Sequence, residues 1–191
     1  MKLYIVRHGE TIANRLGICQ GQSEWSLSDI GLEQAKKIAS RLESEHFDIC
    51  YSSDLIRAYE TAQQIKNKNS FSIIKDVRLR ERCFGSMQGQ KFSDNNKDIN
   101  IDMVYGAESM YDMELRIRAF IDELLSEKRS FEKVLVVTHG VTIKVMLSIL
   151  QNSVFSYDKD MLSIQNVSLT ICDISHGKTT IELFNDTLHL Q

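Results

Sequence analysis

Two His-Gly pairs in the sequence each follow a run of residues typical of a buried strand. His8-Gly9 comes after the strand-like residues 3–6, and His139-Gly140 comes after residues 133–138. An imidazole can act as a nucleophile or carry a proton near neutral pH, and a neighbouring glycine lets a ligand approach closely. One such histidine is more often an ordinary loop residue, but two in the same setting favour a functional site.

Charge restricts what this site could bind. The chain has 23 Lys and Arg residues against 26 Asp and Glu residues, which gives a formal net charge of −3 at pH 7. No global positive field therefore attracts nucleic acid or an anionic membrane, and neither is expected as a partner. Any site for an anion has to be built from a few local arginines.

Alternating strand and helix patterns predict the scaffold that positions the two histidines. Short β-branched runs alternate with segments that place apolar residues on one helical face. This order predicts an α/β fold, a three-layer α/β/α sandwich with a mostly parallel central sheet and ligands at the carboxyl ends of its strands. Ser109 and Asp112 resemble a capping box at the start of one helix. The expected strands are residues 3–6, 48–52, 71–75 and 133–138, with a hairpin of 168–174 and 179–184, and the expected helices are residues 32–42, 55–66, 109–127 and 141–150.

Length and composition indicate one globular domain. A chain of 191 residues can bury about 70% of its surface, which is enough for one core. Residues 1–191 are therefore expected to form a single domain, with a polar lid or substrate loop at residues 86–106.

No apolar run reaches the length of a membrane helix, and Arg7 comes too early for a signal peptide, so a cytoplasmic location is expected. The four cysteines form no C-x-x-C pair, which favours reduced thiols.

The segment around the first histidine resembles a known catalytic signature. Residues 3–11 read LYIVRHGET, which is similar to the signature of the histidine phosphatase superfamily in its phosphoglycerate mutase-like branch. The resemblance implies a phosphoglycerate mutase-like fold. Further motifs of this family follow in the same order and cover nearly the whole chain: Asn14, Gln20-Gly21, residues 27–35, 52–62 and 79–85, Glu108-Ser109, residues 137–140 and Asn185-Asp186.

By this resemblance, five residues carry out phosphoryl transfer. His8 is the nucleophile that becomes phosphohistidine, and Arg7, Arg57 and His139 line the phosphate pocket. Guanidinium groups suit this task because a phosphoryl group in transit carries negative charge on its oxygens. The nearby arginines should also depress the pKa of His8, which keeps its attacking nitrogen unprotonated. Glu81 is the proton donor to the leaving group and then the base that activates water.

Further motif positions are expected to contact the substrate or to support the site. Asn14, Gln20 and Gly21 match positions that contact substrate or phosphate in relatives. Glu10 and Glu108 resemble residues that lie behind the site in the family.

Two expectations concern the loops and the helix around Arg57. Gln88 stands where glutamate is common in the family, and this departure is expected to affect loop packing or leaving-group contacts rather than the phosphoryl-transfer core. Ser53 and Asp54 are expected to cap the helix that carries Arg57 and so to aim this arginine at the pocket.

The resemblance implies a metal-independent phosphatase that hydrolyses phosphomonoesters of small metabolites. The sequence has no H-E-x-x-H, paired Cys or P-loop pattern, so no metal site and no cofactor are expected. Two alternatives remain: a phosphoglycerate mutase-type phosphotransferase and a non-catalytic member that binds a phosphorylated ligand. The mutase is less favoured because mutase relatives are longer, with an insertion before the strand of the second histidine. The chain retains both the nucleophile and the acid, which argues against a non-catalytic member.

The sequence leaves the substrate and the assembly open. The substrate loops fit α-ribazole phosphate, a sugar phosphate, phosphoglycerate or a broad set of phosphomonoesters equally well. Either a monomer or a homodimer is compatible with the composition.

Overall fold

Two parallel strands at the centre of the sheet bring the two His-Gly pairs together. In the computed structural model, which describes residues 1–91, 100–126, 131–153 and 163–191, β1 (Lys2–Arg7) pairs in parallel with β4 (Lys133–Thr138). The register sets Arg7 opposite Thr138, so His8 and His139 leave the sheet side by side at its carboxyl edge. The backbone N–H of His8 donates to the carbonyl of Thr138 at 2.9 Å, which extends the pairing by one residue.

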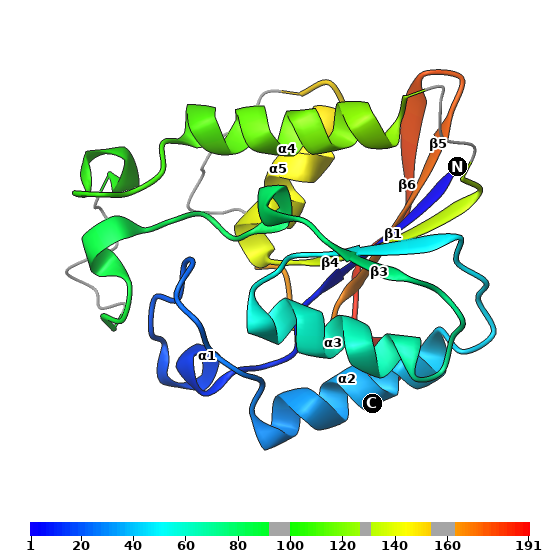
Figure 1. Cartoon of the computed structure of the whole chain (residues 1–191), viewed down its shortest axis with the longest axis horizontal. Helices are drawn as coiled ribbons and strands as arrows, with labels where there is room; N and C mark the ends of the chain where they lie inside the picture. Colours follow the sequence, from blue (N-terminus) through cyan, green and yellow to red (C-terminus); the bar gives the residue numbers. More distant parts are fainter. Residues whose placement is uncertain (92–99, 127–130, 154–162) are drawn as a thin grey trace.

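The remaining strands extend this pair on both sides (Figure 1). The sheet has six strands in the order β3-β2-β4-β1-β5-β6, and β5 runs antiparallel to β1 as the first strand of a hairpin. The strands β3, β2, β4 and β1 are parallel to one another, which confirms the predicted, mostly parallel sheet. The outer strands are β2 (Ile49–Ser52), β3 (Ile73–Lys75), β5 (Leu169–Ser175) and β6 (Lys178–Asp186).

Helices cover both faces of the sheet, as Figure 1 shows. On one face lie α2 (Asp29–Arg41) and α3 (Ile56–Lys66), and on the other lie α4 (Met110–Leu124) and α5 (Gly140–Leu150). The short helix α1 (Ile12–Leu16), which no periodic pattern predicted, follows the first His-Gly pair. Short 3-10 helices lie at Val77–Leu79, Gly85–Met87, Ile101–Met103 and Leu188–Leu190.

Alternation along β1 divides the interior into two cores. Leu3 and Ile5 pack into one core with side chains of α4 and α5, whereas Tyr4 and Val6 pack into the other with side chains of α2 and α3. Successive side chains of a strand point to opposite faces, so a central strand with helices on both sides is apolar at every position. The predicted three-layer sandwich is therefore confirmed.

The start of α4 follows the predicted cap in part. The Ser109 side chain accepts a hydrogen bond from the backbone N–H of Asp112 at 3.0 Å, as an N-cap does. The Asp112 carboxylate accepts from the Ser109 hydroxyl at 2.7 Å. A full capping box would instead direct that carboxylate to the Ser109 backbone N–H.

The prediction that Ser53 and Asp54 cap α3 is wrong. The N-cap residue of this helix makes no side-chain hydrogen bond. The Ser53 hydroxyl accepts from the backbone N–H of Leu55, at 3.3 Å, which precedes the helix, and it also contacts the His139 ring, with 2.8 Å between Oγ and Nε2. The Asp54 carboxylate pairs with Arg80. His139 and Arg80 are far away in the sequence, so local cap preferences do not indicate these partners.

The predicted lid at residues 86–106 falls partly on residues 92–99, which lie outside the described part of the chain. Its two described flanks are tied together, because the backbone N–H of Ser86 donates to the carbonyl of Tyr105 at 3.0 Å. A lid role for this loop stays a prediction.

Two further expectations concern membranes and thiols. No helix within the described residues is both long and apolar enough to cross a membrane. Cys19, Cys50, Cys83 and Cys172 are free thiols, and all but Cys83 are buried.

Gly31 lies in the first turn of α2, directly against the loop that follows His8. A Cβ atom at this position would lie 1.9 Å from the carbonyl oxygen of Glu10. Because the obstacle is backbone, Gly31→Ala should lower the free energy of unfolding by roughly 2–3 kcal/mol, measured by urea titration. Gly140→Ala is the matched control, because its Cβ would have no neighbour nearer than 3.7 Å. Equal unfolding free energies for the two variants would contradict this packing.

Candidate active site

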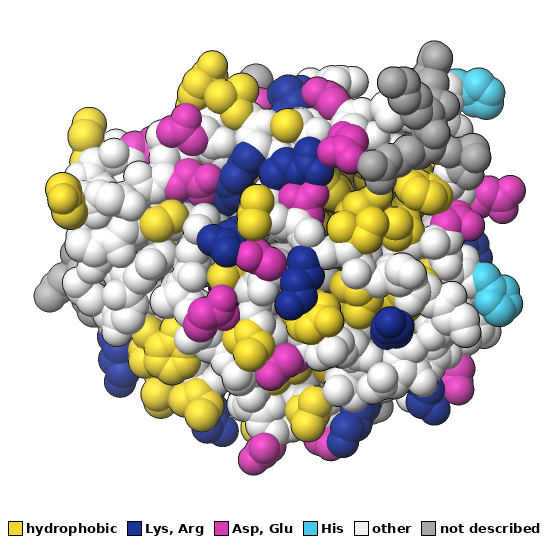
Figure 2. Space-filling view, in the orientation of Figure 1, with side chains coloured by type: hydrophobic (Ala, Val, Ile, Leu, Met, Phe, Trp, Pro, Cys, Tyr) yellow, Lys and Arg dark blue, Asp and Glu magenta, His cyan; other side chains and the backbone are white. Residues whose placement is uncertain are grey.

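A cavity of about 370 Å³ opens at the carboxyl ends of β1 and β4, where the two His-Gly pairs meet. On the face shown in Figure 2, Lys and Arg side chains are interspersed with Asp and Glu rather than gathered into one broad cationic surface. A site for an anion has to be local on such a surface. Most of the residues predicted from the sequence line this cavity, namely Arg7, His8, Asn14, Gln20, Gly21, Arg57 and Glu81.

The His8 ring is held so that one nitrogen is left for a ligand. The side chain is 2% exposed, and its Nδ1 atom lies 2.7 Å from the carbonyl oxygen of Gly9. A carbonyl oxygen can only accept, so Nδ1 carries the proton and Nε2 of the neutral ring keeps its lone pair. Burial is the largest cause that holds the pKa of His8 well below its usual 6.5, followed by the positive charges of Arg57 and Arg7. A buried, neutral imidazole with a free nitrogen has the properties of a nucleophile.

Two arginines, the buried Arg57 and the half-buried Arg7, provide positive charge beside this ring. Arg57 donates to the carbonyls of Gly21 and Ser23 at 2.7 and 3.0 Å, and Arg7 donates to the carbonyl of Ile164. Neither guanidinium forms an ion pair among the described residues, and the Nε atom of each is buried without a hydrogen-bond partner there. Burial lowers the pKa of Arg57 to about 10, a sign of a cation short of counter-charge.

Other arginines around the site differ because they pair with carboxylates. The pairs are Arg80 with Asp54, Arg82 with Asp102 and Arg116 with Glu108. Of these arginines, Arg7 and Arg57 thus keep their charge for an anionic ligand, whose oxygens could accept from the unpartnered N–H groups.

His139 lies against His8 and is not among the residues that line the cavity. Its side chain is fully buried, and the two ring centroids are 5.1 Å apart at an interplanar angle of 58°. The Nε2 atom lies 2.8 Å from the Ser53 hydroxyl, whereas Nδ1 is buried and has no partner among the described residues. Burial first, and then the charge of Arg57, holds the pKa of His139 well below 6.5. The structure therefore places a second neutral imidazole next to the first.

The Glu81 carboxylate is fixed at the start of α5. It accepts from the backbone N–H groups of Arg82, Val141 and Thr142 at 3.0, 3.2 and 3.3 Å. The Thr142 hydroxyl donates to the same carboxylate at 3.3 Å. Gly140 lies beside both this carboxylate and Arg7. A Cβ atom at position 140 would be 3.9 Å from Oε2 of Glu81 and 3.7 Å from Nε of Arg7, so the glycine leaves this space free. The acid–base candidate and Arg7 thus border the same space beside Gly140.

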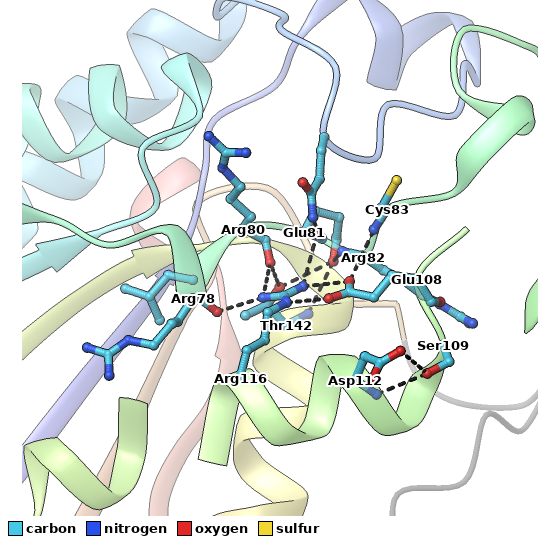
Figure 3. Close-up of polar contacts among 12 residues, drawn as sticks. Arg78, Arg80, Glu81, Arg82, Cys83, Glu108, Ser109, Asp112, Arg116 and Thr142 are labelled. Atoms are coloured by element: carbon cyan, nitrogen blue, oxygen red, sulfur yellow. Dashed lines mark hydrogen bonds and ion pairs between the residues drawn. The ribbon is translucent and has the colours of Figure 1, made fainter. Parts of the chain in front are cut away.

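Arg116 of α4 anchors the backbone on which Glu81 stands (Figure 3). Its guanidinium donates to the carbonyls of Arg78, Arg80 and Glu81 at 2.6, 2.8 and 3.2 Å. The same group pairs with Glu108, a residue expected to support the site. No motif indicated Arg116. One sequence signal could have indicated it. Arg116 lies three positions after Met113 and four before Phe120, so this charged residue stands on the apolar face of the helix, which is turned to the interior.

Asn14 and Gln20 present their amide groups at the cavity wall. The Asn14 Oδ1 atom accepts from the backbone N–H of Thr11 at 3.1 Å, within a capping box at the start of α1. The Gln20 Oε1 atom accepts from the Thr11 hydroxyl at 2.9 Å. Because both amide oxygens are used within the protein, the donor nitrogens are the groups left for a ligand.

Gln88 joins two loops at the edge of the cavity. Its Oε1 atom accepts from the backbone N–H groups of Gln22 and Phe84 at 2.8 and 3.3 Å. Gly21 is required here, because its φ is +52° and a Cβ would lie 2.1 Å from that oxygen. The expected role of Gln88 in loop packing agrees with these contacts.

Several cavity residues were not indicated by the sequence. The most notable is Lys144, which follows His139 by little more than one turn of α5. Val141 lies on the same side of that helix. The remaining ones are Ile18, Ser163 and Ile164, which come from loops without a recognisable pattern, whereas Phe84 belongs to the motif that carries Glu81.

Proton uptake by the buried histidines should make the stability of the fold depend on pH. The pKa values of His8 and His139 lie well below 6.5 in the folded chain. At a pH below 6.5 but above these folded-state values, the two histidines are neutral in the folded chain and become protonated when it unfolds. The histidine contribution to stability should therefore be constant above about pH 7 and fall as the pH is lowered, with a limiting slope of about 1.4 kcal/mol per pH unit for each histidine. Burial also lowers the pKa of His189, to about 4, which adds to the slope.

Urea titrations between pH 7.5 and 5 measure this slope. His139→Gln should reduce it, whatever its effect on the absolute free energy of unfolding, whereas His46→Gln changes an exposed histidine and should not. An unchanged slope in His139→Gln would show that this imidazole is not held neutral by the fold.

Comparison with known proteins places this geometry in a family. Residues 3–187 match the histidine phosphatase superfamily (branch 1). Phosphoglycerate mutase-like protein 4 of Arabidopsis thaliana is 33% identical over 207 residues, which cover 100% of this chain and 87% of the relative.

Two solved structures share the fold. Phosphoglycerate mutase from Bacillus anthracis superposes with a TM-score of 0.86 at 29% identity, over 100% of this chain and 95% of the other. Phosphoserine phosphatase from Entamoeba histolytica, in complex with 3-phosphoglyceric acid, superposes with a TM-score of 0.84 at 28% identity, over 100% and 99%. Phosphatases of this superfamily support the predicted enzyme class, a phosphoric monoester hydrolase. The predicted family is confirmed, and the chain belongs to the histidine phosphatase superfamily, branch 1.

Proposed function

We propose that this protein hydrolyses phosphomonoesters of small metabolites through a phosphohistidine on His8, without a metal ion. One observation carries the proposal. Nδ1 of His8 is committed to the Gly9 carbonyl, which leaves Nε2 as a free nucleophile beside the guanidinium groups of Arg7 and Arg57, whose Nε atoms are buried and have no partner among the described residues. Donors and charge that stand in place before the substrate binds lower the barrier to phosphoryl transfer without further reorganisation.

In the first half-reaction, Arg7 and Arg57 hold the phosphoryl oxygens and Nε2 of His8 attacks phosphorus. The N–P bond forms as the P–O bond to the leaving group breaks, and a protonated Glu81 gives its proton to the departing oxygen. In the second half-reaction, the Glu81 carboxylate takes a proton from water, whose oxygen attacks phosphorus. The N–P bond then breaks, inorganic phosphate leaves, and both His8 and Glu81 return to their starting states.

His139 is proposed to act on His8 and on the transferring group from its buried position. The centroid of its ring lies 5.1 Å from that of the His8 ring. Asn14 and Gln20 are proposed to donate to phosphoryl or substrate oxygens through their amide nitrogens. Gly21 contributes its backbone carbonyl, which fixes Arg57.

The mutase alternative differs only in the acceptor of the phosphoryl group. Chain length does not decide against it, because this chain covers 95% of the protein named phosphoglycerate mutase from Bacillus anthracis. Hydrolysis is supported by the similarity to a phosphoserine phosphatase that matches over 99% of its length. A non-catalytic role is disfavoured, since a binding protein has no need of both a free imidazole nitrogen and a carboxylate fixed beside it.

Turnover of an aryl phosphate with and without chelator tests the mechanism. Wild-type protein should hydrolyse p-nitrophenyl phosphate equally well in EDTA. His8→Ala should lower kcat by at least about 10³-fold, because it removes the nucleophile. His46→Ala is the matched control at an exposed histidine. An alkaline quench of wild-type protein with labelled substrate should trap phosphohistidine, and full activity of His8→Ala would refute the mechanism.

A second experiment separates the phosphatase from the mutase. The protein is mixed with 3-phosphoglycerate and a bisphosphoglycerate primer, and both products are followed. Release of inorganic phosphate should exceed formation of 2-phosphoglycerate, because water is the proposed acceptor. Isomer formation much faster than phosphate release would assign the chain to the mutases.

A further inference from the structure

The cavity contains a third cation that the proposed phosphoryl transfer does not use. Lys144 of α5 lines the cavity with a half-buried side chain. No hydrogen bond or ion pair joins its ammonium group to another described residue. Burial is the largest cause that lowers the pKa of Lys144, and the charge of Arg7 adds to it while Glu81 opposes it. A cation in this setting is stabilised when a ligand supplies a negative charge.

The position of Lys144 identifies the part of the substrate that it would meet. Val141 and Lys144 are three residues apart, which places them on the same face of α5, and both line the cavity. The N–H of Val141 binds the Glu81 carboxylate, the group proposed to protonate the leaving oxygen. Lys144 therefore lies on the side of Glu81 where the leaving group must be, whereas Arg7 and Arg57 serve the phosphoryl end.

The surroundings of Lys144 would strengthen such a contact. Ile18, Phe84, Val141 and Ile164 also line the cavity and add apolar side chains to its wall. Charge interactions gain strength where apolar groups replace water. The two guanidinium groups already match the charge of a phosphate dianion, so the ammonium of Lys144 is in excess of what the phosphoryl group needs.

We propose that Lys144 is a specificity-determining residue that binds a second anionic group, such as a carboxylate or a further phosphate, on the leaving group of the substrate. This inference rests on the proposed function, because it needs the phosphoryl group to be bound by Arg7 and Arg57. It assigns the preferred substrates to phosphomonoesters whose alcohol part is itself an anion.

Matched pairs of substrates test the inference. The pairs are 3-phosphoglycerate with glycerol 3-phosphate, and phosphoserine with phosphoethanolamine, because in each pair the second compound lacks the carboxylate. Wild-type protein should show a higher kcat/KM for the carboxylate-bearing member of each pair. Lys144→Met should lower this ratio about tenfold, mainly through KM, as expected for loss of a charge-assisted contact.

Two further variants separate recognition from general electrostatics. Lys144→Arg keeps the charge and should retain part of the preference. Lys66→Met removes an exposed lysine in the last turn of α3, away from the cavity, and should leave both activities and their ratio unchanged. A ratio that is the same in wild type and Lys144→Met would overturn the inference, and so would an equal loss for both members of each pair.

The failure of the proposed function gives a different result. If wild-type protein turns over none of these compounds, the hydrolytic function fails, and calorimetric affinities for 3-phosphoglycerate and glycerol 3-phosphate still test Lys144. Tighter binding of 3-phosphoglycerate that is lost in Lys144→Met would support the inference without catalysis. Equal affinities in wild type would overturn it.

Discussion

The register between β1 and β4 is the constraint on which the rest of the site depends. Arg7 pairs with Thr138, so both strands end at the same level and release a histidine at the same edge. A slip of one residue would turn every side chain of β1 to the opposite face. The two separate cores on either side of the sheet oppose this slip, because each accepts a different set of alternate residues. Apolar packing thus determines where His8 and His139 meet.

Backbone carbonyls then hold the charged groups that the site needs. The guanidinium groups of Arg7 and Arg57 bind carbonyls of Ile164, Gly21 and Ser23, which orient them without cancelling their charge. A carboxylate in the same place would form an ion pair and compete with a phosphoryl group. Leaving two cations buried costs stability, which the depressed pKa of Arg57 reflects, and the binding of an anion offsets that cost.

The two ends of the cavity have different origins in the sequence. The phosphoryl end is built from the motif residues that directly follow β1 and from Arg57 on α3. The other end is built from α5, which carries Lys144, from Phe84 of the Glu81 motif, and from loops without a recognisable motif, where Ile18 and Ile164 lie. This division agrees with a family whose members share a fold and yet carry mutase and phosphatase names.

The strands, the main helices and the two histidines could be predicted from the sequence, because apolar periodicity and the His-Gly motifs are local properties. The tertiary structure alone decided which polar groups act together. Ser53 contacts His139 across 86 positions of the chain, and Arg116 reaches the carbonyl of Glu81 across 35. Lys144 also has no local pattern that marks it as part of the cavity. A hydrogen-bond or charge partner is selected by distance in space, which is set only when the helices and the sheet have packed.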